Sequence, residues 1–263
     1  MDFASHISDD RCPALEDVRL ENCSYLTARY EITSFSLKKL VVDGLYMVQD
    51  DESDDDEDEI FKLIIRAPAL VSLRLAGELD HIVDINEPHT VPSLVDASVH
   101  LPVMTDEELN NVEENDATAH QSVLGVLLNV TTLTLSHCRS YLKTGNWMSG
   151  FQLLFQPEDS VELQLLVFQN LRTLFLDECY IVGEDFVGLK PYLQKSPNLE
   201  KLILRCSKNW YFGDDLVDFM CENLMLTQII YQHDDDAAPL LVAFLLSISR
   251  SLPNNKIELI RVE

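Results

Sequence analysis

The chain has 263 residues and carries 45 acidic against 19 basic side chains, so its formal charge is −26 and its isoelectric point lies near 4.4. This charge argues against nucleic-acid and anionic-membrane partners, because the phosphates of both repel an acidic protein. A hydrophobic content of 46% is ordinary for a globular chain and argues against general disorder.

The N-terminal end has no features of a targeting segment. Its first ten residues contain three aspartates and no apolar stretch, which argues against a secretory signal peptide. The apolar run Leu240 to Leu246 is too short to cross a membrane. The six cysteines are therefore expected to be reduced, buried thiols, and the protein is expected in the cytoplasm or nucleus.

A triplet of the form apolar-x-x-apolar-x-apolar recurs along the chain. Clear copies open at Leu15, Leu37, Leu70, Val130, Leu171 and Leu199, and weaker copies open at Leu94, Leu226 and Ile257. Chance alone produces some of these triplets in a chain rich in Leu, Ile and Val. The surroundings are more telling: a proline lies two places before the opening residue at Pro13, Pro68, Pro92 and Pro197, and a cysteine lies eight places after it at Cys23, Cys138 and Cys179.

The last two apolar residues of each triplet are separated by one residue, so they point to the same face of a strand. Stacked copies would bury a continuous apolar column. With the following Cys or Asn, the pattern matches the leucine-rich-repeat consensus. We therefore predict an α/β fold: an irregular leucine-rich-repeat solenoid with a parallel β-sheet on its concave face and helices or loops on its convex face.

The segments between the triplets are expected to return through helices and loops. Apolar residues three and four apart predict helices at Glu59–Arg66, His120–Leu128, Glu184–Gln194, Asp214–Cys221 and Pro239–Ser251. Two segments are expected to be solvated loops: an acidic insert at residues 49–59 and a polar loop at residues 105–118. The predicted organisation is a short N-terminal segment, residues 1–14, and one domain, residues 15–263, of about eight to nine irregular repeats.

The chain resembles the leucine-rich-repeat region of plant F-box proteins. The segments that carry this resemblance are CPALEDVRLENC (Cys12–Cys23), SLKKLVVDG (Ser36–Gly44), APALVSLRLAG (Ala67–Gly77), FQNLRTLFLDEC (Phe168–Cys179) and SPNLEKLIL (Ser196–Leu204). In that family an N-terminal F-box docks onto the small adaptor of a cullin-type ubiquitin ligase, and the repeats hold the substrate. Here the first triplet opens at Leu15, which leaves no room for an F-box, so a truncated, fragmentary or partner-capped form is expected. The adaptor would be a partner only if an F-box were supplied elsewhere.

Binding is expected on the concave face, through the residue between the two strand positions of each triplet. In successive copies this residue is Arg19, Val41, Arg74, Ser98, Thr134, Phe175, Ile203 and Ile230, so that the last three form an apolar stripe. The candidate protein-binding residues are Arg19, Arg74, Phe175, Asp177, Lys201, Ile203, Arg205, Gln228 and Ile230. The alternative is structural, since β-branched and aromatic residues suit strands in any case or could be covered by another segment.

The acidic insert contains nine acids in the ten positions from Asp50 to Glu59. Its simplest interpretation is a solvated loop. Two sharper hypotheses are a decoy for basic partners and a phosphorylation site at Ser53, which acids follow directly. The sequence lacks the spaced acids and central glycine of an EF-hand, so calcium binding is not expected.

No catalytic motif is recognisable. The sequence contains no G-x-S-x-G, H-E-x-x-H, phosphate-binding or dinucleotide-binding pattern, and no C-x-x-C pair for zinc. His137 beside Cys138 is interpreted as a surface neighbour of a turn residue, and His233 before three aspartates as part of a charged loop. We therefore expect no enzyme activity, cofactor or metal.

Two classes of function remain. The resemblance implies the substrate-recognition part of an F-box-type ubiquitin ligase component, with a protein substrate or peptide as partner. The alternative is a free-standing acidic leucine-rich-repeat scaffold, or a chaperone-like binder of basic protein partners.

Overall fold

The structure is a computed structural model. It describes residues 12–25, 29–44, 46–47, 62–77, 83–84, 91–100, 127–136, 167–177, 193, 195–205, 221–232 and 254–262. The acidic insert with Ser53, the polar loop, His137, His233, Cys138, Cys179 and Cys206 lie outside these residues. The predicted division into residues 1–14 and 15–263 stays a prediction.

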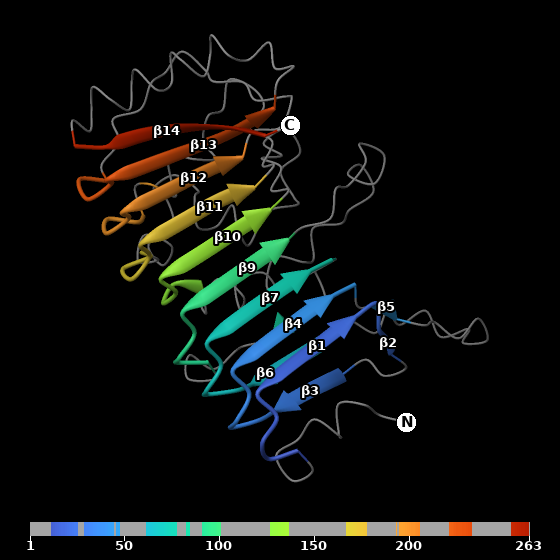
Figure 1. The fold of residues 1–263 in the computed structure, drawn as a ribbon. Coiled ribbons are helices and arrows are strands. Elements are labelled where there is room, and N and C mark those ends of the chain that lie inside the picture. The colour runs from blue at the N-terminus through green and yellow to red at the C-terminus, as the bar shows by residue number, and fades with distance from the viewer. Residues whose placement is uncertain are drawn as a thin grey trace, which may run out of the picture.

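Nine parallel strands form one sheet, and within this sheet they lie side by side in the order in which they occur along the chain (Figure 1). The strands are β1 (Asp17–Glu21), β4 (Lys39–Asp43), β7 (Ser72–Ala76), β9 (Asp96–His100), β10 (Thr132–Ser136), β11 (Thr173–Asp177), β12 (Lys201–Arg205), β13 (Leu226–Gln232) and β14 (Lys256–Val262). The sheet is open, because β1 and β14 lie at opposite ends and do not close into a barrel. The predicted parallel sheet is confirmed.

Two smaller parallel sheets are formed by the segments that follow β1, β4 and β7, the first three strands of the main sheet. One consists of β3 (Arg29–Thr33), β6 (Lys62–Arg66) and β8 (Val83–Asp84), and the other of β2 (Ser24–Tyr25) and β5 (Tyr46–Met47). Ile32, Leu63 and Ile65 are fully buried and belong to the same core cluster as the leucines of the main sheet. In this part of the protein the second layer is therefore made of strands.

The helix predicted at Glu59–Arg66 is wrong, because Lys62–Arg66 forms strand β6. A short apolar run does not distinguish helix from strand by its periodicity. Ile64 and Ile65 favour a strand, and pairing of Tyr30 with Leu63 and of Ile32 with Ile65 provides its neighbour. Helices on the convex side are not supported either: Leu127 and Leu193 are the only helical positions among the described residues.

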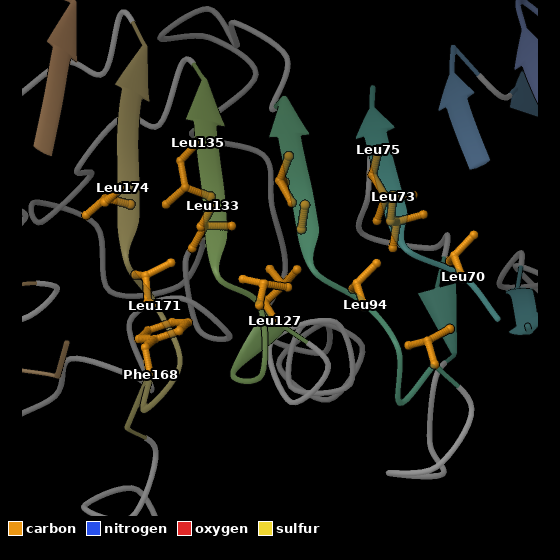
Figure 2. Packing of buried hydrophobic residues seen from close by; sticks show 14 of the residues in the cluster. Leu70, Leu73, Leu75, Leu94, Leu127, Leu133, Leu135, Phe168, Leu171 and Leu174 are labelled. Carbon is orange, nitrogen blue, oxygen red and sulfur yellow. The ribbon is translucent and has the colours of Figure 1, made fainter. Parts of the chain in front are cut away.

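The apolar columns predicted from the triplets form the core (Figure 2). In seven units, each consisting of a turn and its following strand, both strand positions of the triplet are buried: Val18 and Leu20, Leu40 and Val42, Leu73 and Leu75, Ala97 and Val99, Leu133 and Leu135, Leu174 and Leu176, and Leu202 and Leu204. Figure 2 shows Leu70, Leu94 and Leu171, which open their units, near the same core. Alternation along each strand therefore determines which side of the sheet is buried.

A hydrogen-bonded turn leads into the opening residue, and it explains the recurring proline. The N–H of the opening residue donates to the carbonyl three places earlier in seven units: Leu15 to Cys12, Leu70 to Ala67, Leu94 to Val91, Val130 to Leu127, Leu171 to Phe168, Leu199 to Ser196 and Leu224 to Cys221. The four prolines occupy the second position of such turns, where a φ near −65° is required and no N–H is needed. The first turn position, which the triplet does not include, is also buried at Phe168 and Cys221.

The main sheet is joined at its starting edge by a ladder of shared carbonyls. The carbonyl of the residue before each strand accepts two N–H groups of the next unit at 2.8 to 3.1 Å: Glu16, Lys38, Val71, Val95, Thr131, Arg172 and Glu200. The carbonyl of Met225 continues the series and accepts the N–H of Lys256 at 2.7 Å. The first residues of neighbouring strands are thus aligned with one another, which keeps the register constant across all nine strands.

Asparagine side chains reinforce the later turns. Asn198 donates to the carbonyl of Gln169 at 2.9 Å, and Asn223 donates to the carbonyl of Pro197 at 3.0 Å. Both asparagines directly precede the opening leucine of their units. An asparagine directly before the opening residue was not part of the predicted pattern, although it also occurs at Asn129, before Val130, and at Asn170, before Leu171.

The described cysteines are free thiols. Cys221 is fully buried and its Sγ donates to the carbonyl of Leu193 at 2.9 Å. Burial raises the pKa of this thiol to about 12, so Cys221 is neutral and unreactive in the folded protein. Cys12 and Cys23 are only partly buried, so the expectation of buried thiols holds for Cys221 alone among these three. No helix of the described part is long and apolar enough to span a membrane.

Residues in the left-handed backbone conformation directly follow the first three strands of the main sheet. Asn22, Gly44 and Gly77 directly follow β1, β4 and β7, with φ of 50°, 66° and 110°. The N–H of Gly44 donates to the carbonyl of Ala76, so the turn also links neighbouring units. A Cβ atom at Gly44 would lie 2.9 Å from Oδ1 of Asn22.

We predict that Gly44→Ala lowers the free energy of unfolding by about 1–2 kcal/mol, because an L-residue with a Cβ is disfavoured in the left-handed region. Denaturant titration measures the change. Asn22→Gly serves as the control and should leave stability nearly unchanged, since glycine adopts this φ freely. Equal losses in both variants would contradict this prediction.

Candidate functional site

The face of the main sheet opposite the core is named here the open face. It consists of the residues of each strand that alternate with the buried positions, as the burial of β11 and β12 shows. The five-residue strands contribute three such residues each, and the seven-residue strands β13 and β14 contribute four each. Its central column, in register across the nine strands, is Arg19, Val41, Arg74, Ser98, Thr134, Phe175, Ile203, Gln228 and Glu258. One row of side chains therefore runs from one end of the sheet to the other.

All nine candidate binding residues lie on the open face. Arg19, Arg74, Phe175 and Ile203 occupy the central column, as predicted. The predicted first seven members of that column are correct, and the eighth is wrong: Gln228 pairs with Ile203, whereas Ile230 pairs with Arg205. The apolar stripe therefore does not run straight from Phe175 through Ile203 to Ile230.

The error arises from a polar residue in the buried column. Thr227, fully buried, takes the position that Leu202 holds in the preceding strand. Its Oγ1 accepts a hydrogen bond from Nδ2 of Asn255 at 2.9 Å, which satisfies the buried hydroxyl. Because threonine is not apolar, the triplet pattern predicted Leu226 as the opening residue, whereas the structure has Leu224 at that position. The Asn223–Leu224 dipeptide is the sequence signal that would have given the correct register.

The predicted register of the last strand is also wrong. Ile257 was predicted to open the last unit, but it pairs with the buried Thr227 and packs against the core. Glu258, on the other side of β14, is therefore the last member of the central column.

Charge is balanced on the open face, unlike in the chain as a whole. Its six cations are Lys39, Lys201, Lys256, Arg19, Arg74 and Arg205, and its six anions are Asp17, Asp43, Asp96, Asp177, Glu21 and Glu258. The formal charge of this face is thus zero in a chain of −26. Contact at this face avoids the repulsion that the rest of the protein imposes on acidic partners.

Side-chain types are separated along the sheet. On β1, β4 and β7 the open face is mostly charged, and its apolar members, Val41 and Ala76, are buried. On β9 and β10 hydroxyl groups predominate. Apolar side chains that remain at least partly exposed occur only on the last four strands, and they are Phe175, Ile203, Leu226, Ile230, Ile260 and Val262. We call these six residues the apolar zone. Leu226, Ile260 and Val262 were not among the predicted binding residues.

Arg205 organises one side of the apolar zone. Its Nη1 donates to Oδ1 of Asp177 at 2.8 Å, and its guanidinium carbon lies 5.4 Å from the centre of the Phe175 ring. Stacking on the Phe175 ring and the ion pair with Asp177 both restrict the conformations that the Arg205 side chain can adopt. An ordered arginine beside an aromatic ring is typical of the residues that dominate protein–protein interfaces.

Glu258 organises the other side. Its carboxylate accepts hydrogen bonds from Nζ of Lys256 at 2.6 Å and from Nε2 of Gln228 at 2.7 Å. These hydrogen bonds, with the positive charges of Lys256 and Lys201, lower the pKa of Glu258 below its ordinary value. The carboxylate is therefore charged throughout the physiological range.

We predict that Glu258 titrates at lower pH than an ordinary glutamate and that Lys256→Ala shifts its pKa upward. Because the folded-state pKa is the lower one, the stabilisation from this group is present above the unfolded-state pKa and is lost as pH falls through the folded-state value. Carboxyl-resolved NMR titration of both proteins measures the shift. An unchanged Glu258 pKa in the variant would contradict the assigned cause.

The open face combines apolar and charged side chains on one surface. Within the described ranges, no group of three or more His, Cys, Asp or Glu side chains is placed to hold a metal ion.

The described part of the protein is thus an open parallel sheet with one buried and one amphipathic face. The chain is 31% identical, over 211 residues and 76% of its length, to a meiotic F-box protein, MOF, of rice (Oryza sativa subsp. japonica). It spans 38% of the length of that protein. No protein-family model and no solved structure matches the chain. The chain is therefore similar to a plant F-box protein, and its assignment to the leucine-rich repeats stays a prediction.

Proposed function

We propose that this chain is a non-catalytic protein-binding module that acts as the substrate-recognition part of an F-box-type ubiquitin ligase component. The observation that carries the proposal is the 31% identity to the rice F-box protein across 76% of the chain. The chain would work in the cytoplasm or nucleus and would bind a protein or peptide substrate through the open face.

The properties of the open face support this role. It presents side chains from nine strands on one continuous surface, and its charge is balanced. The apolar zone supplies apolar surface whose burial favours association. Arg205 and Glu258 would orient a bound partner, because hydrogen bonds within the sheet already hold their side chains in place. Such a surface binds a partner without changing it chemically.

Affinity purification tests the ligase part of the proposal. The protein, expressed from its own gene in plant cells with a C-terminal tag, is expected to co-purify with the small ligase adaptor and a cullin. The name of the rice relative makes cells in meiosis the first material to examine. Recovery of basic proteins without adaptor or cullin would overturn the ligase role and favour the acidic scaffold or chaperone-like binder.

A further inference from the structure

Two of the three charged side chains in the central column of the open face are held in ion pairs. Arg19 pairs with Glu21 at 3.1 Å, and Glu258 pairs with Lys256 at 2.6 Å. The third, Arg74 on β7, is exposed and has no ion-pair partner among the residues that the structure describes. An arginine in this state can form two parallel hydrogen bonds with a carboxylate of a partner.

The direct neighbours of Arg74 on the open face are all uncharged. Val41 and Ser98 lie beside it in register on β4 and β9. Ser72 and Ala76 lie two residues before and after it on its own strand. No carboxylate of the sheet therefore lies directly across from Arg74 or next to it along β7.

The two carboxylates on the diagonals, Asp43 and Asp96, form no ion pair with Arg74. Asp96 instead accepts a hydrogen bond from Oγ of Ser72 at 3.2 Å. The guanidinium of Arg74 is thus available to a carboxylate that comes from outside the sheet.

Two strands with hydroxyl side chains separate Arg74 from the apolar zone. β9 and β10 lie between β7 and β11 (Figure 1), and Ser98 and Thr134 occupy the central column there. Neighbouring strands are about 4.8 Å apart, so Arg74 and Phe175 are about 14 Å apart along the column. An extended chain rises about 3.4 Å per residue and covers this distance in about four residues. Side chains four residues apart in such a chain also point to the same side.

The hydroxyl groups between these two points favour an extended segment over a helix. Ser98 and Thr134 are partly exposed, and their hydroxyls can both donate and accept hydrogen bonds. An extended segment offers its own N–H and C=O groups to such contacts, whereas a helix uses these groups internally.

We propose that the open face binds an extended peptide segment that runs across the strands and carries an acidic residue four positions from a large apolar residue. The carboxylate pairs with Arg74, and the apolar side chain packs on Phe175 and its register neighbour Ile203. This inference rests on the proposed function, because it names the kind of substrate segment that the open face holds. Since the chain as a whole carries −26, acceptance of the acidic residue depends on Arg74.

A set of fluorescent synthetic peptides tests the proposal. Each peptide contains one glutamate and one leucine, separated by two to seven positions, with serine or threonine at every other position and both orders represented. Fluorescence anisotropy with the full chain at physiological salt measures the dissociation constants. In at least one order, binding is expected to be tightest at a separation of four. It should be about tenfold weaker at three or five, where one of the two side chains points away from the sheet.

Exchanging charges identifies the contact with the carboxylate. Arg74→Glu should bind the best glutamate peptide about tenfold more weakly, and binding should recover when lysine replaces the glutamate of the peptide. Lys38→Glu is the matched control, because it makes the same change of charge at an exposed residue that precedes β4 and lies outside the open face. This control should bind the glutamate peptide like the wild type.

Several outcomes would overturn the proposal: no binding of any peptide, equal binding at all separations, or undiminished binding of the glutamate peptide by Arg74→Glu. Absence of recovery with the lysine peptide, in a variant with the circular dichroism spectrum of the wild type, would overturn it too. The ligase role is judged separately, by recovery of the adaptor and cullin from plant cells, which Arg74→Glu should leave unchanged.

Discussion

Replacing Phe175 and Ile203 together by aspartate is expected to abolish recovery of the protein partners that bind the open face, while the ligase adaptor is retained. The two residues are paired on adjacent strands at the centre of the apolar zone, and two carboxylates there would remain unpaired on binding. Affinity purification of the tagged protein, with quantification of each partner, measures the effect.

The fold should survive this double substitution. Both side chains are only partly buried, so we expect a loss of about 1–2 kcal/mol from poorer strand propensity and from the lost stacking of Arg205 on Phe175. Val71→Asp with Val95→Asp is the matched control, since both valines are exposed, at 42% and 44%, and lie outside the open face. Equal partner recovery from wild type and the Phe175 and Ile203 variant, or equal loss in the control, would refute the binding role.

Phe168→Ala is expected to give a large loss of stability, about 3–5 kcal/mol, because a fully buried aromatic side chain leaves a cavity when it is removed. Phe168 occupies the first position of the turn before β11, and Figure 2 shows its ring beneath Leu171. Such a loss is a large part of the total stability of a typical domain. Denaturant titration provides the free energy of unfolding.

Phe35→Ala is the control for this substitution. Phe35 lies shortly before β4 and is 72% exposed, so its removal should change stability by no more than about 0.5 kcal/mol. A similar effect of both substitutions would mean that Phe168 does not pack as the structure describes.

The buried side of the main sheet could be predicted from local pattern alone. Alternation in Leu73–Arg74–Leu75 determines which side chains point inward, and Pro68 places the turn that precedes them. Both features act within a few residues of the chain. The same physics holds in seven of the nine strands, which is why the predicted central column is correct from Arg19 to Ile203.

Prediction failed where a distant partner decided the local structure. Lys62–Arg66 is a strand because β3 supplies its hydrogen bonds, and no local periodicity distinguishes this from a helix. Thr227 occupies the buried column because Asn255, 28 residues later, satisfies its hydroxyl. Both cases depend on contacts between segments that are far apart in the sequence.

In seven of the nine strands, the sequence by itself determined which side chains are buried and which are exposed, because strand alternation and turn chemistry are local. Only the tertiary structure decided the register of the last two strands and the contacts between individual side chains on neighbouring strands. Asp177 and Arg205 are 28 residues apart, yet the register of β11 and β12 brings their side chains to 2.8 Å. The same register sets Gln228 beside Ile203, because the position of each strand depends on its hydrogen bonds to the strand before it.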